Sequence, residues 1–174
     1  MLHLSELNKQ FQSDKGGKHC YLQDYYQIKF DPVRESTKTV LEIGVYEGAS
    51  IRLWKEYFVN ADIYALEKLH KRSGLFQGED RIHLVIGDSV TSNSYTSMPN
   101  DLDIIIDDGS HKPEDQFATF QQAFTKLSTG GMYIIEDVRD IEHLSRLMQN
   151  VNYKIYDFRH KACPDSVIFE IIKR

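Results

Sequence analysis

The stretch TVLEIGVYEGAS, residues 39–50, is typical of a buried strand, a glycine turn and the start of a helix. Gly44 and Gly48 permit backbone conformations and close approaches that a Cβ atom would obstruct. The amides at the following helix start can then face an anionic group such as a carboxylate. The order is E-x-G-x-x-x-G, not the G-x-G-x-x-G of a dinucleotide loop, which places a hydride-transferring dehydrogenase last among the alternatives.

Short apolar runs alternate with amphipathic stretches from this point to the C-terminus. Ile104–Ile106 and Tyr133–Ile135 are continuously apolar, as expected of strands covered on both faces. The runs predict strands at Thr39–Gly44, Asp62–Glu67, Ile82–Gly87, Leu102–Asp107, Met132–Glu136, Tyr153–Arg159 and Ser166–Ile172, with helices at Ala49–Phe58, Pro113–Leu127 and Ile141–Gln149. We therefore expect an α/β fold: a Rossmann-like, doubly wound, mostly parallel seven-stranded sheet with an antiparallel C-terminal hairpin.

The bulk properties favour one globular domain over residues 1–174, with a core at 39–174. A formal charge of −5 argues against nucleic acid as the main partner. No apolar run reaches membrane-spanning length, and Met1–Gln10 lacks the plan of a signal peptide, so a cytoplasmic protein is expected. Cys20 and Cys163 match no metal-ligand spacing and are expected to be free thiols.

Residues 1–38 differ from the rest of the chain and are expected to form a helical flap. The aromatic residues among them recur at near-helical spacing, at Tyr21, Tyr25, Tyr26 and Phe30. One interpretation is an amphipathic helix that packs these rings on the sheet. Another is a flap over a site at the carboxyl edge of the sheet, and the two can hold together.

Polar side chains follow the second and third expected strands. Glu67 ends a strand about 20 residues after the glycine loop, where an acid can accept both hydroxyls of a ribose. Asp88 and Ser89 follow the next strand, where an adenine amino group would lie. Parallel α/β sheets bind ligands along this edge, so the combination predicts a nucleoside-containing ligand.

Four carboxylates should crowd at one corner of that edge. Asp107 and Asp108 follow the fourth strand and Glu136 and Asp137 the fifth, and neighbouring strands lie roughly 4.8 Å apart. Like charges so close require either protonation of some groups or a cation among them. We assign Asp108, Glu136 and Asp137 to a hard divalent ion, most plausibly Mg²⁺, and Asp107 to the ligand side. The alternative is that these acids cap helices, as Asp108 or Ser110 could before Pro113.

His111 lies three residues beyond Asp108 on a glycine turn and can reach the same corner. A lone loop histidine is usually only solvated. Beside a metal candidate, this one is a candidate general base near neutral pH.

The arrangement from Thr39 onward resembles a class I S-adenosylmethionine-dependent methyltransferase, and its glycine loop resembles that of catechol-type O-methyltransferases. The resemblance implies that Glu42, Tyr46 and Ser50, with Gly44 and Gly48, hold the methionine part of the cofactor. It implies a ribose contact from Glu67 and adenine contacts from Asp88 and Ser89. Because adjacent strand residues point to opposite faces, Asp107 is expected to face the cofactor and its ammonium group.

A closer resemblance is to the family of macrocin- and mycinamicin-type sugar O-methyltransferases and their cephalosporin-hydroxylase-like relatives. Its recognisable blocks here are Asp14-Lys15-Gly16, His19-x-Tyr21, residues 106–111 and residues 130–137. The resemblance implies a metal at Asp108, Glu136 and Asp137 with His111 as base.

The expected reaction is methyl transfer from S-adenosylmethionine to a hydroxyl of a small molecule or sugar, assisted by Mg²⁺ or another divalent ion. The alternatives are a metal-independent methyltransferase acting on a nitrogen or simple hydroxyl, and a non-catalytic ligand-sensing module. We expect no nucleic-acid or membrane partner, and a homo-oligomer stays open.

Overall fold

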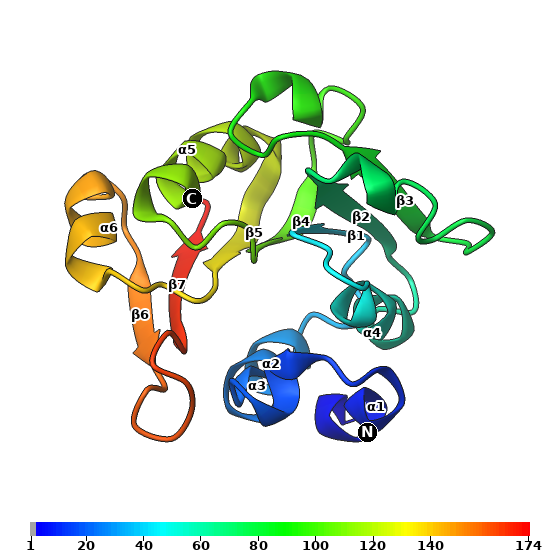
Figure 1. Cartoon of the computed structure of the whole chain (residues 1–174), viewed down its shortest axis with the longest axis horizontal. Helices are drawn as coiled ribbons and strands as arrows, with labels where there is room; N and C mark the ends of the chain where they lie inside the picture. Colours follow the sequence, from blue (N-terminus) through cyan, green and yellow to red (C-terminus); the bar gives the residue numbers. More distant parts are fainter. Residues whose placement is uncertain (1–2) are drawn as a thin grey trace.

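Seven strands form one sheet in the order β3-β2-β1-β4-β5-β7-β6 (Figure 1). The structure is a computed structural model and describes residues 3–174. The strands are β1 (Thr39–Ile43), β2 (Asp62–Glu67), β3 (Ile82–Ile86), β4 (Leu102–Asp107), β5 (Leu127–Ile135), β6 (Lys154–Asp157) and β7 (Val167–Ile172). The first five pair in parallel, whereas β7 runs antiparallel to both β5 and β6. The predicted Rossmann-like sheet with a terminal antiparallel hairpin is confirmed.

Helices cover both faces of the sheet, so its central strands are apolar on both sides. Ile104 and Ile106 pack in one core cluster with α4 (Ala49–Tyr57), while Ile105 packs in the other. The second face is covered by α5 (Pro113–Ala123), α6 (Ile141–Leu147) and the 3₁₀ turn η3 (Ser92–Tyr95). This alternation explains why residues 104–106 form an unbroken apolar run.

The aromatics from Tyr21 to Phe30 lie on one continuous helical stretch, as their spacing predicts, and the N-terminal segment contains several short helical elements. These are α1 (Leu4–Phe11), α2 (Asp14–Gly17), the π-helical turn η1 (Leu22–Tyr26) and α3 (Gln27–Phe30). Cys20 has φ +61°, which breaks any continuous helix between α2 and η1. The segment lies beside α4, on the same side of the sheet (Figure 1).

The aromatics of this segment are core residues, as the packing interpretation predicted. Tyr21, Tyr25, Tyr26 and Phe30 are at most 1% exposed. Tyr26 and Phe30 both contact the Trp54 ring of α4, with centroids 5.0 and 5.6 Å away. The segment thus belongs to the main hydrophobic core.

Two boundaries differ from expectation by more than two residues. β5 begins at Leu127, five residues before the predicted start, because Leu127 pairs with Leu102 of β4. The predicted helix 113–127 ends as an α-helix at Ala123 and continues as the 3₁₀ turn η4 (Phe124–Lys126). The remaining 3₁₀ turn, η2 (His70–Arg72), follows β2.

Across residues 3–174, no helix combines the length and apolar character needed to cross a bilayer.

Candidate active site

A cavity of about 850 Å³ lies at the carboxyl ends of the parallel strands. Its walls come from the loops after β1 to β5 and from the residues around α2. Backbone pairing continues past the strand ends: the Gly44 N–H donates to the Leu66 carbonyl and the Asp108 N–H to the Ile43 carbonyl, both at 2.9 Å. These bonds fix the loops relative to one another. The volume is within the range of about 300–1,000 Å³ that small-molecule sites occupy.

The glycine turn after β1 packs directly against the loop after β4. Gly44 has φ +90°, and a Cβ atom there would lie 2.0 Å from the carbonyl oxygen of Asp108. Gly48 has φ +79°, and a Cβ atom there would lie 2.6 Å from the ring of Phe76. Both positions therefore require glycine for backbone reasons. Gly44 lines the cavity, whereas Gly48 lies behind it.

Glu42 lies beneath the glycine turn and is fully buried. Its carboxylate accepts hydrogen bonds from Ser50 Oγ at 2.8 Å and from Trp54 Nε1 at 2.6 Å. Burial raises the pKa of Glu42, although the Lys15 ammonium 3.3 Å away opposes the rise. Glu42 thus holds Ser50, which does line the cavity, in its place.

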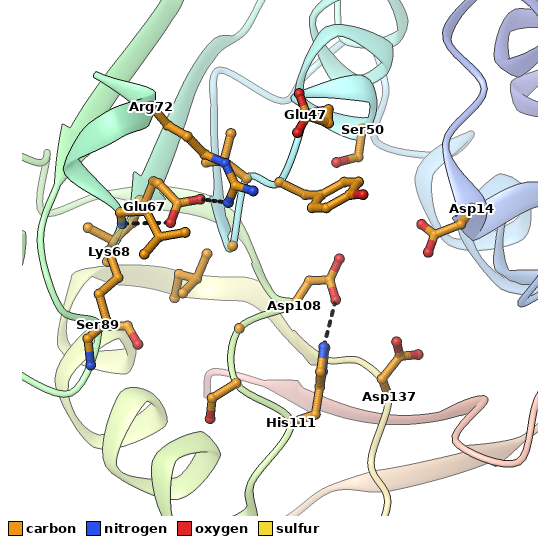
Figure 2. Close-up of a pocket in the computed structure, with 18 of the residues that line it drawn as sticks. Asp14, Glu47, Ser50, Glu67, Lys68, Arg72, Ser89, Asp108, His111 and Asp137 are labelled. Atoms are coloured by element: carbon orange, nitrogen blue, oxygen red, sulfur yellow. Dashed lines mark hydrogen bonds and ion pairs between the residues drawn. The ribbon is translucent and has the colours of Figure 1, made fainter. Parts of the chain in front are cut away.

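Glu67 faces the cavity with a cation already beside it. Its carboxylate accepts hydrogen bonds from Arg72 Nη1 and from the Leu69 N–H, each at 2.8 Å (Figure 2). Burial acts to raise the pKa of Glu67, but these donors outweigh it and lower the pKa. The Arg72 guanidinium also lies 5.3 Å from the centre of the Tyr46 ring. Tyr46 is 74% exposed and has φ +48°, so its ring is available at the cavity entrance.

Asp88 and Ser89 line the next part of the wall. Lys68 Nζ lies 2.7 Å from Asp88 Oδ2, and this hydrogen bond lowers the pKa of Asp88. Ser89 Oγ lies 2.9 Å from Thr119 Oγ1 of α5. The three predicted polar positions after β1, β2 and β3 therefore open into one cavity.

The predicted crowding of carboxylates is present, and the cation among them comes from the N-terminal segment. Lys15 is 2% exposed, and its Nζ donates to Asp108 Oδ2 at 2.6 Å and to Glu136 Oε2. Burial alone would lower the pKa of Lys15, but the charges of Asp108, Glu136 and Glu42 outweigh it and raise the pKa well above its usual value. Lys15 is therefore an ammonium ion that compensates the cluster.

Glu136 is buried behind the cavity wall and does not line it. One of its carboxylate oxygens accepts from Lys15 Nζ and the other from Tyr26 Oη. Burial raises its pKa, and Lys15 opposes that rise. Both oxygens are thus occupied by donors from the N-terminal segment.

Asp108, His111 and Asp137 face one another across the cavity (Figure 2). One ligand atom from each lies within 4.8 Å of the others. His111 Nε2 is 3.9 Å from Asp108 Oδ1, too far for a hydrogen bond, and its buried Nδ1 has no partner among the described residues. Burial, followed by the charge of Asp108, raises the pKa of Asp137. Both His111 and Asp137 have left-handed backbones, with φ +58° and +52°, a strained state that clusters at functional sites.

Asp107 differs from its neighbour Asp108, as the alternation of strand residues predicts. It is 1% exposed, accepts from the Gly109 N–H at 3.3 Å and lies outside the cavity lining. Burial raises the pKa of Asp107 to about 8. Asp107 therefore supports the turn that carries Asp108 and His111.

The structure separates the predicted site residues into two groups. Nine line the cavity: Gly44, Tyr46, Ser50, Glu67, Asp88, Ser89, Asp108, His111 and Asp137. Four lie directly behind its wall: Glu42, Gly48, Asp107 and Glu136.

Sequence reasoning missed Lys15, Tyr21 and Arg72 as residues of this site. Tyr21 Oη donates to Asp137 Oδ1 at 2.8 Å. In the sequence, Asp14-Lys15-Gly16 is only a block of the family resemblance, although the charge argument calls for a cation at this corner. Lys15 pairs with Asp108 and Glu136, which lie 93 and 121 positions away along the chain, so no local sequence pattern predicts these contacts.

No family model matches the chain. A 2'-O-methyltransferase of 8-demethyl-8-alpha-L-rhamnosyl tetracenomycin-C from Streptomyces olivaceus is 36% identical over 137 residues, which cover 73% of this chain and 35% of that protein. The mycinamicin VI 2''-O-methyltransferase of Micromonospora griseorubida is 32% identical over 145 residues, covering 78% and 36%. The chain therefore spans about a third of the length of these relatives.

Solved structures lead to the same group. The methyltransferase MycE of the mycinamycin biosynthetic pathway, in complex with Mg and SAH, superposes with a TM-score of 0.79 and 26% identity, covering 99% of this chain and 55% of MycE. A complex of MycE that also contains mycinamycin VI superposes with a TM-score of 0.78 and 25% identity, covering 99% and 54%. The chain is a homologue of the macrocin- and mycinamicin-type sugar O-methyltransferases and has their class I S-adenosylmethionine-dependent methyltransferase fold.

Proposed function

We propose that the chain transfers a methyl group from S-adenosylmethionine to a hydroxyl of a sugar or another small molecule, with a divalent ion at Asp108 and Asp137. The observation that carries the proposal is one cavity that joins two sets of side chains. Tyr46, Glu67 and Asp88 place polar side chains along one part of the cavity wall. Asp108 and His111 line another part of the same cavity. The homologues are named as O-methyltransferases of sugars on natural products, which supports the same reaction class.

The cofactor end rests on residues of the first three loops. Tyr46 and Ser50 would bind the methionine part, with Glu42 holding Ser50 through the 2.8 Å hydrogen bond. Glu67 would accept the ribose hydroxyls, and Asp88 with Ser89 would contact the adenine. Arg72 now occupies one oxygen of Glu67, so it shares that carboxylate with the ribose or moves aside.

The carboxylates of Asp108 and Asp137 fit a hard divalent ion such as Mg²⁺. Asp108 and Asp137 offer carboxylate oxygens within one small volume, and Mg²⁺ prefers such oxygens. Glu136, the third predicted ligand, would join them if the ion replaced the Lys15 ammonium beside it. When bound, such an ion supplies Lewis acidity that lowers the pKa of a coordinated hydroxyl.

His111 is the proposed general base. Its ring faces the cavity on the turn after β4, and its buried Nδ1 is without a hydrogen-bond partner among the described residues. Imidazole titrates near neutral pH, so an acceptor hydroxyl bound beside Asp108 could give its proton to His111. The strained backbone of His111 holds the ring at that place.

The direct test measures binding and turnover separately. Calorimetry with S-adenosylhomocysteine should give binding in the wild-type chain and weaker binding in Glu67→Gln. With S-adenosylmethionine, Mg²⁺ and methyl α-L-rhamnopyranoside as acceptor probe, S-adenosylhomocysteine should accumulate. Cofactor binding without turnover on any hydroxyl probe would instead favour the ligand-sensing alternative.

A second candidate, metal-independent methyl transfer, is favoured by Lys15. Its ammonium already compensates Asp108, Glu136 and Glu42, so the cluster does not need an ion to exist. Turnover that survives complete chelation would support this candidate, and turnover restored only by Mg²⁺ would exclude it.

A further inference from the structure

The loop between β6 and β7 meets the N-terminal segment beside the cavity, and their meeting point contains a second set of metal-type donors. His19 lies between α2 and η1, while Cys163 and Asp165 lie on the loop. A ring nitrogen of His19, the Cys163 sulfur and a carboxylate oxygen of Asp165 lie within 4.8 Å of one another. Cys163 and Asp165 lie 144 and 146 positions after His19, so no spacing motif in the sequence predicts that the three residues meet.

His19 is buried with an unsatisfied ring nitrogen. The residue is 2% exposed, and its Nε2 has no hydrogen-bond partner among the described residues. The Asp14 carboxylate, 3.8 Å away, is beyond hydrogen-bond distance. A buried polar nitrogen without a partner loses its hydration with nothing in exchange, so such a group in a folded protein calls for an explanation.

Ser166 holds both the ring and the loop. His19 Nδ1 lies 2.9 Å from Ser166 Oγ, and the same oxygen accepts the Cys163 N–H at 3.0 Å. Nδ1 also lies 3.3 Å from Asp137 Oδ1. A proton on Nδ1 satisfies these acceptors and leaves Nε2 as an unprotonated donor atom, which is how histidine ligands are commonly oriented.

The remaining donors are accessible for coordination. Cys163 is a free thiol and is partly exposed. Arg139 Nε lies 3.4 Å from Asp165 Oδ2, and Asp165 Oδ1 has no hydrogen-bond or ion-pair partner among residues 3–174. The carboxylate also lines the cavity, which gives an ion a path of entry.

We propose that His19, Cys163 and Asp165 bind a borderline divalent cation of the Zn²⁺ class. Imidazole, thiolate and carboxylate together suit Zn²⁺ or Co²⁺, whereas Mg²⁺ avoids sulfur. Three protein ligands leave one tetrahedral position for water or for Asp14. On binding, the Cys163 thiol loses its proton to solvent and becomes the thiolate ligand.

The ion would join two segments that both reach the proposed methyl-transfer site. The His19 ring stacks on Tyr21 with centroids 5.2 Å apart, and Tyr21 Oη donates to Asp137. A cation at His19 would therefore fix the tyrosine that holds Asp137. The site is made of other residues than Asp108, His111 and Asp137, and its test does not depend on methyl transfer.

The test is a Co²⁺ titration of the reduced, chelator-treated full chain, followed by absorption spectroscopy. We expect a thiolate-to-cobalt charge-transfer band that saturates at one equivalent. Zn²⁺ should abolish the band, and excess Mg²⁺ should leave it unchanged. Absence of the band in fully reduced protein would overturn the proposal.

Matched variants locate the ion. Cys163→Ser should lose the band, whereas Cys20→Ser, which removes the other thiol next to His19, should keep it. Ser166→Ala should weaken Co²⁺ binding about 10- to 100-fold by releasing the ring. A band that disappears in Cys20→Ser and persists in Cys163→Ser would overturn the assignment.

Thermal unfolding gives a second readout in case a variant folds poorly. Zn²⁺ should raise the Tm of the wild-type chain and of Asp108→Asn, but not that of Asp165→Asn. Equal stabilisation of wild type and Asp165→Asn, or loss of the effect in Asp108→Asn alone, would place the ion elsewhere and refute the proposal.

Discussion

At the residue scale, His111 and Glu136 show how two predicted site residues acquire different surroundings. His111 projects into the cavity from a strained turn, with its Nδ1 lacking a partner among the described residues. Glu136 lies behind the wall with both oxygens occupied. The proposed roles of base and metal ligand therefore call for separate experiments.

His111→Ala should lower turnover by about 10²–10⁴-fold, the usual contribution of a general base, while the affinity for S-adenosylhomocysteine stays nearly intact. The measurement is kcat with the rhamnoside probe beside calorimetry of cofactor binding. His83→Ala is the matched control, because His83 lies on β3 outside the cavity lining, where it pairs with Asp62 and its ring stacks on Tyr64. Equal turnover in His111→Ala and the control would remove His111 from the chemistry.

Glu136→Gln separates a metal ligand from a buried support. If the ion takes Glu136 in exchange for Lys15, the variant should lose Mg²⁺ affinity as severely as Asp108→Asn, because a carboxylate ligand is gone. Calorimetry with Mg²⁺ in the presence of S-adenosylhomocysteine measures both variants. Unchanged affinity in Glu136→Gln would confine the ion to Asp108 and Asp137.

At the element scale, the glycine turn and the loop after β4 depend on each other. Gly44→Ala places a methyl group 2.0 Å from the Asp108 carbonyl and also strains a backbone at φ +90°. Gly78→Ala is a clean control, since Gly78 has φ +83° but nothing within 4 Å of an added Cβ. The control should lose roughly 1–2 kcal/mol from backbone strain alone. Gly44→Ala should lose more, and should bind S-adenosylhomocysteine more weakly; equal losses of unfolding free energy would mean that the loop contact relaxes freely.

The joint between α3 and α4 should respond to acid. Asp31 accepts hydrogen bonds from Tyr57 Oη and Gln27 Nε2, both at 2.6 Å, and these lower its pKa below the usual 3.8. A depressed carboxyl pKa contributes stability above the unfolded pKa that is lost as pH falls through the folded one. The Tm difference between wild type and Asp31→Asn should therefore stay constant from about pH 7 to about pH 5 and shrink as the pH falls below about 4. Tyr57→Phe should show part of the same loss, and a Tm difference that stays constant below about pH 4 would contradict the linkage.

The elements that were predictable from sequence are those set by local pattern. Ile104–Ile106 and the glycine turn at Gly44 carry their structural environment in their own residue types, so the strands and the loop were placed correctly. The start of β5 was not, because Leu127 is a strand residue only through its pairing with Leu102. The break between α2 and η1 was not predictable either, since Cys20 adopts a left-handed conformation that no local preference indicates.

At the scale of the whole molecule, the charge balance of the acid cluster links the two ends of the chain. Reasoning from like charges predicted a compensating cation but not its source, because Lys15 approaches Asp108 and Glu136 only after the sheet and the N-terminal segment have packed together. The same packing brings Tyr21 to Asp137 and His19 to the loop after β6. The N-terminal segment is thus part of the site as well as of the core.

Lys15→Met should therefore destabilise the entire fold by about 3–5 kcal/mol, the cost of removing one partner from a buried charge network. Asp108, Glu136 and Glu42 would lose their counter-charge, and the pKa values of the buried Glu42 and Glu136 would rise further. Urea unfolding measures the loss, and Lys18→Met is the control, because Lys18 is largely exposed and lies 3.8 Å from Asp14. Adding Glu136→Gln to Lys15→Met should cost less than the sum of the single changes, since the second change removes one of the stranded charges. Mg²⁺ should also stabilise Lys15→Met more than wild type, because the ion replaces the missing ammonium. Additive losses with no response to Mg²⁺ would show that Lys15 only fills space.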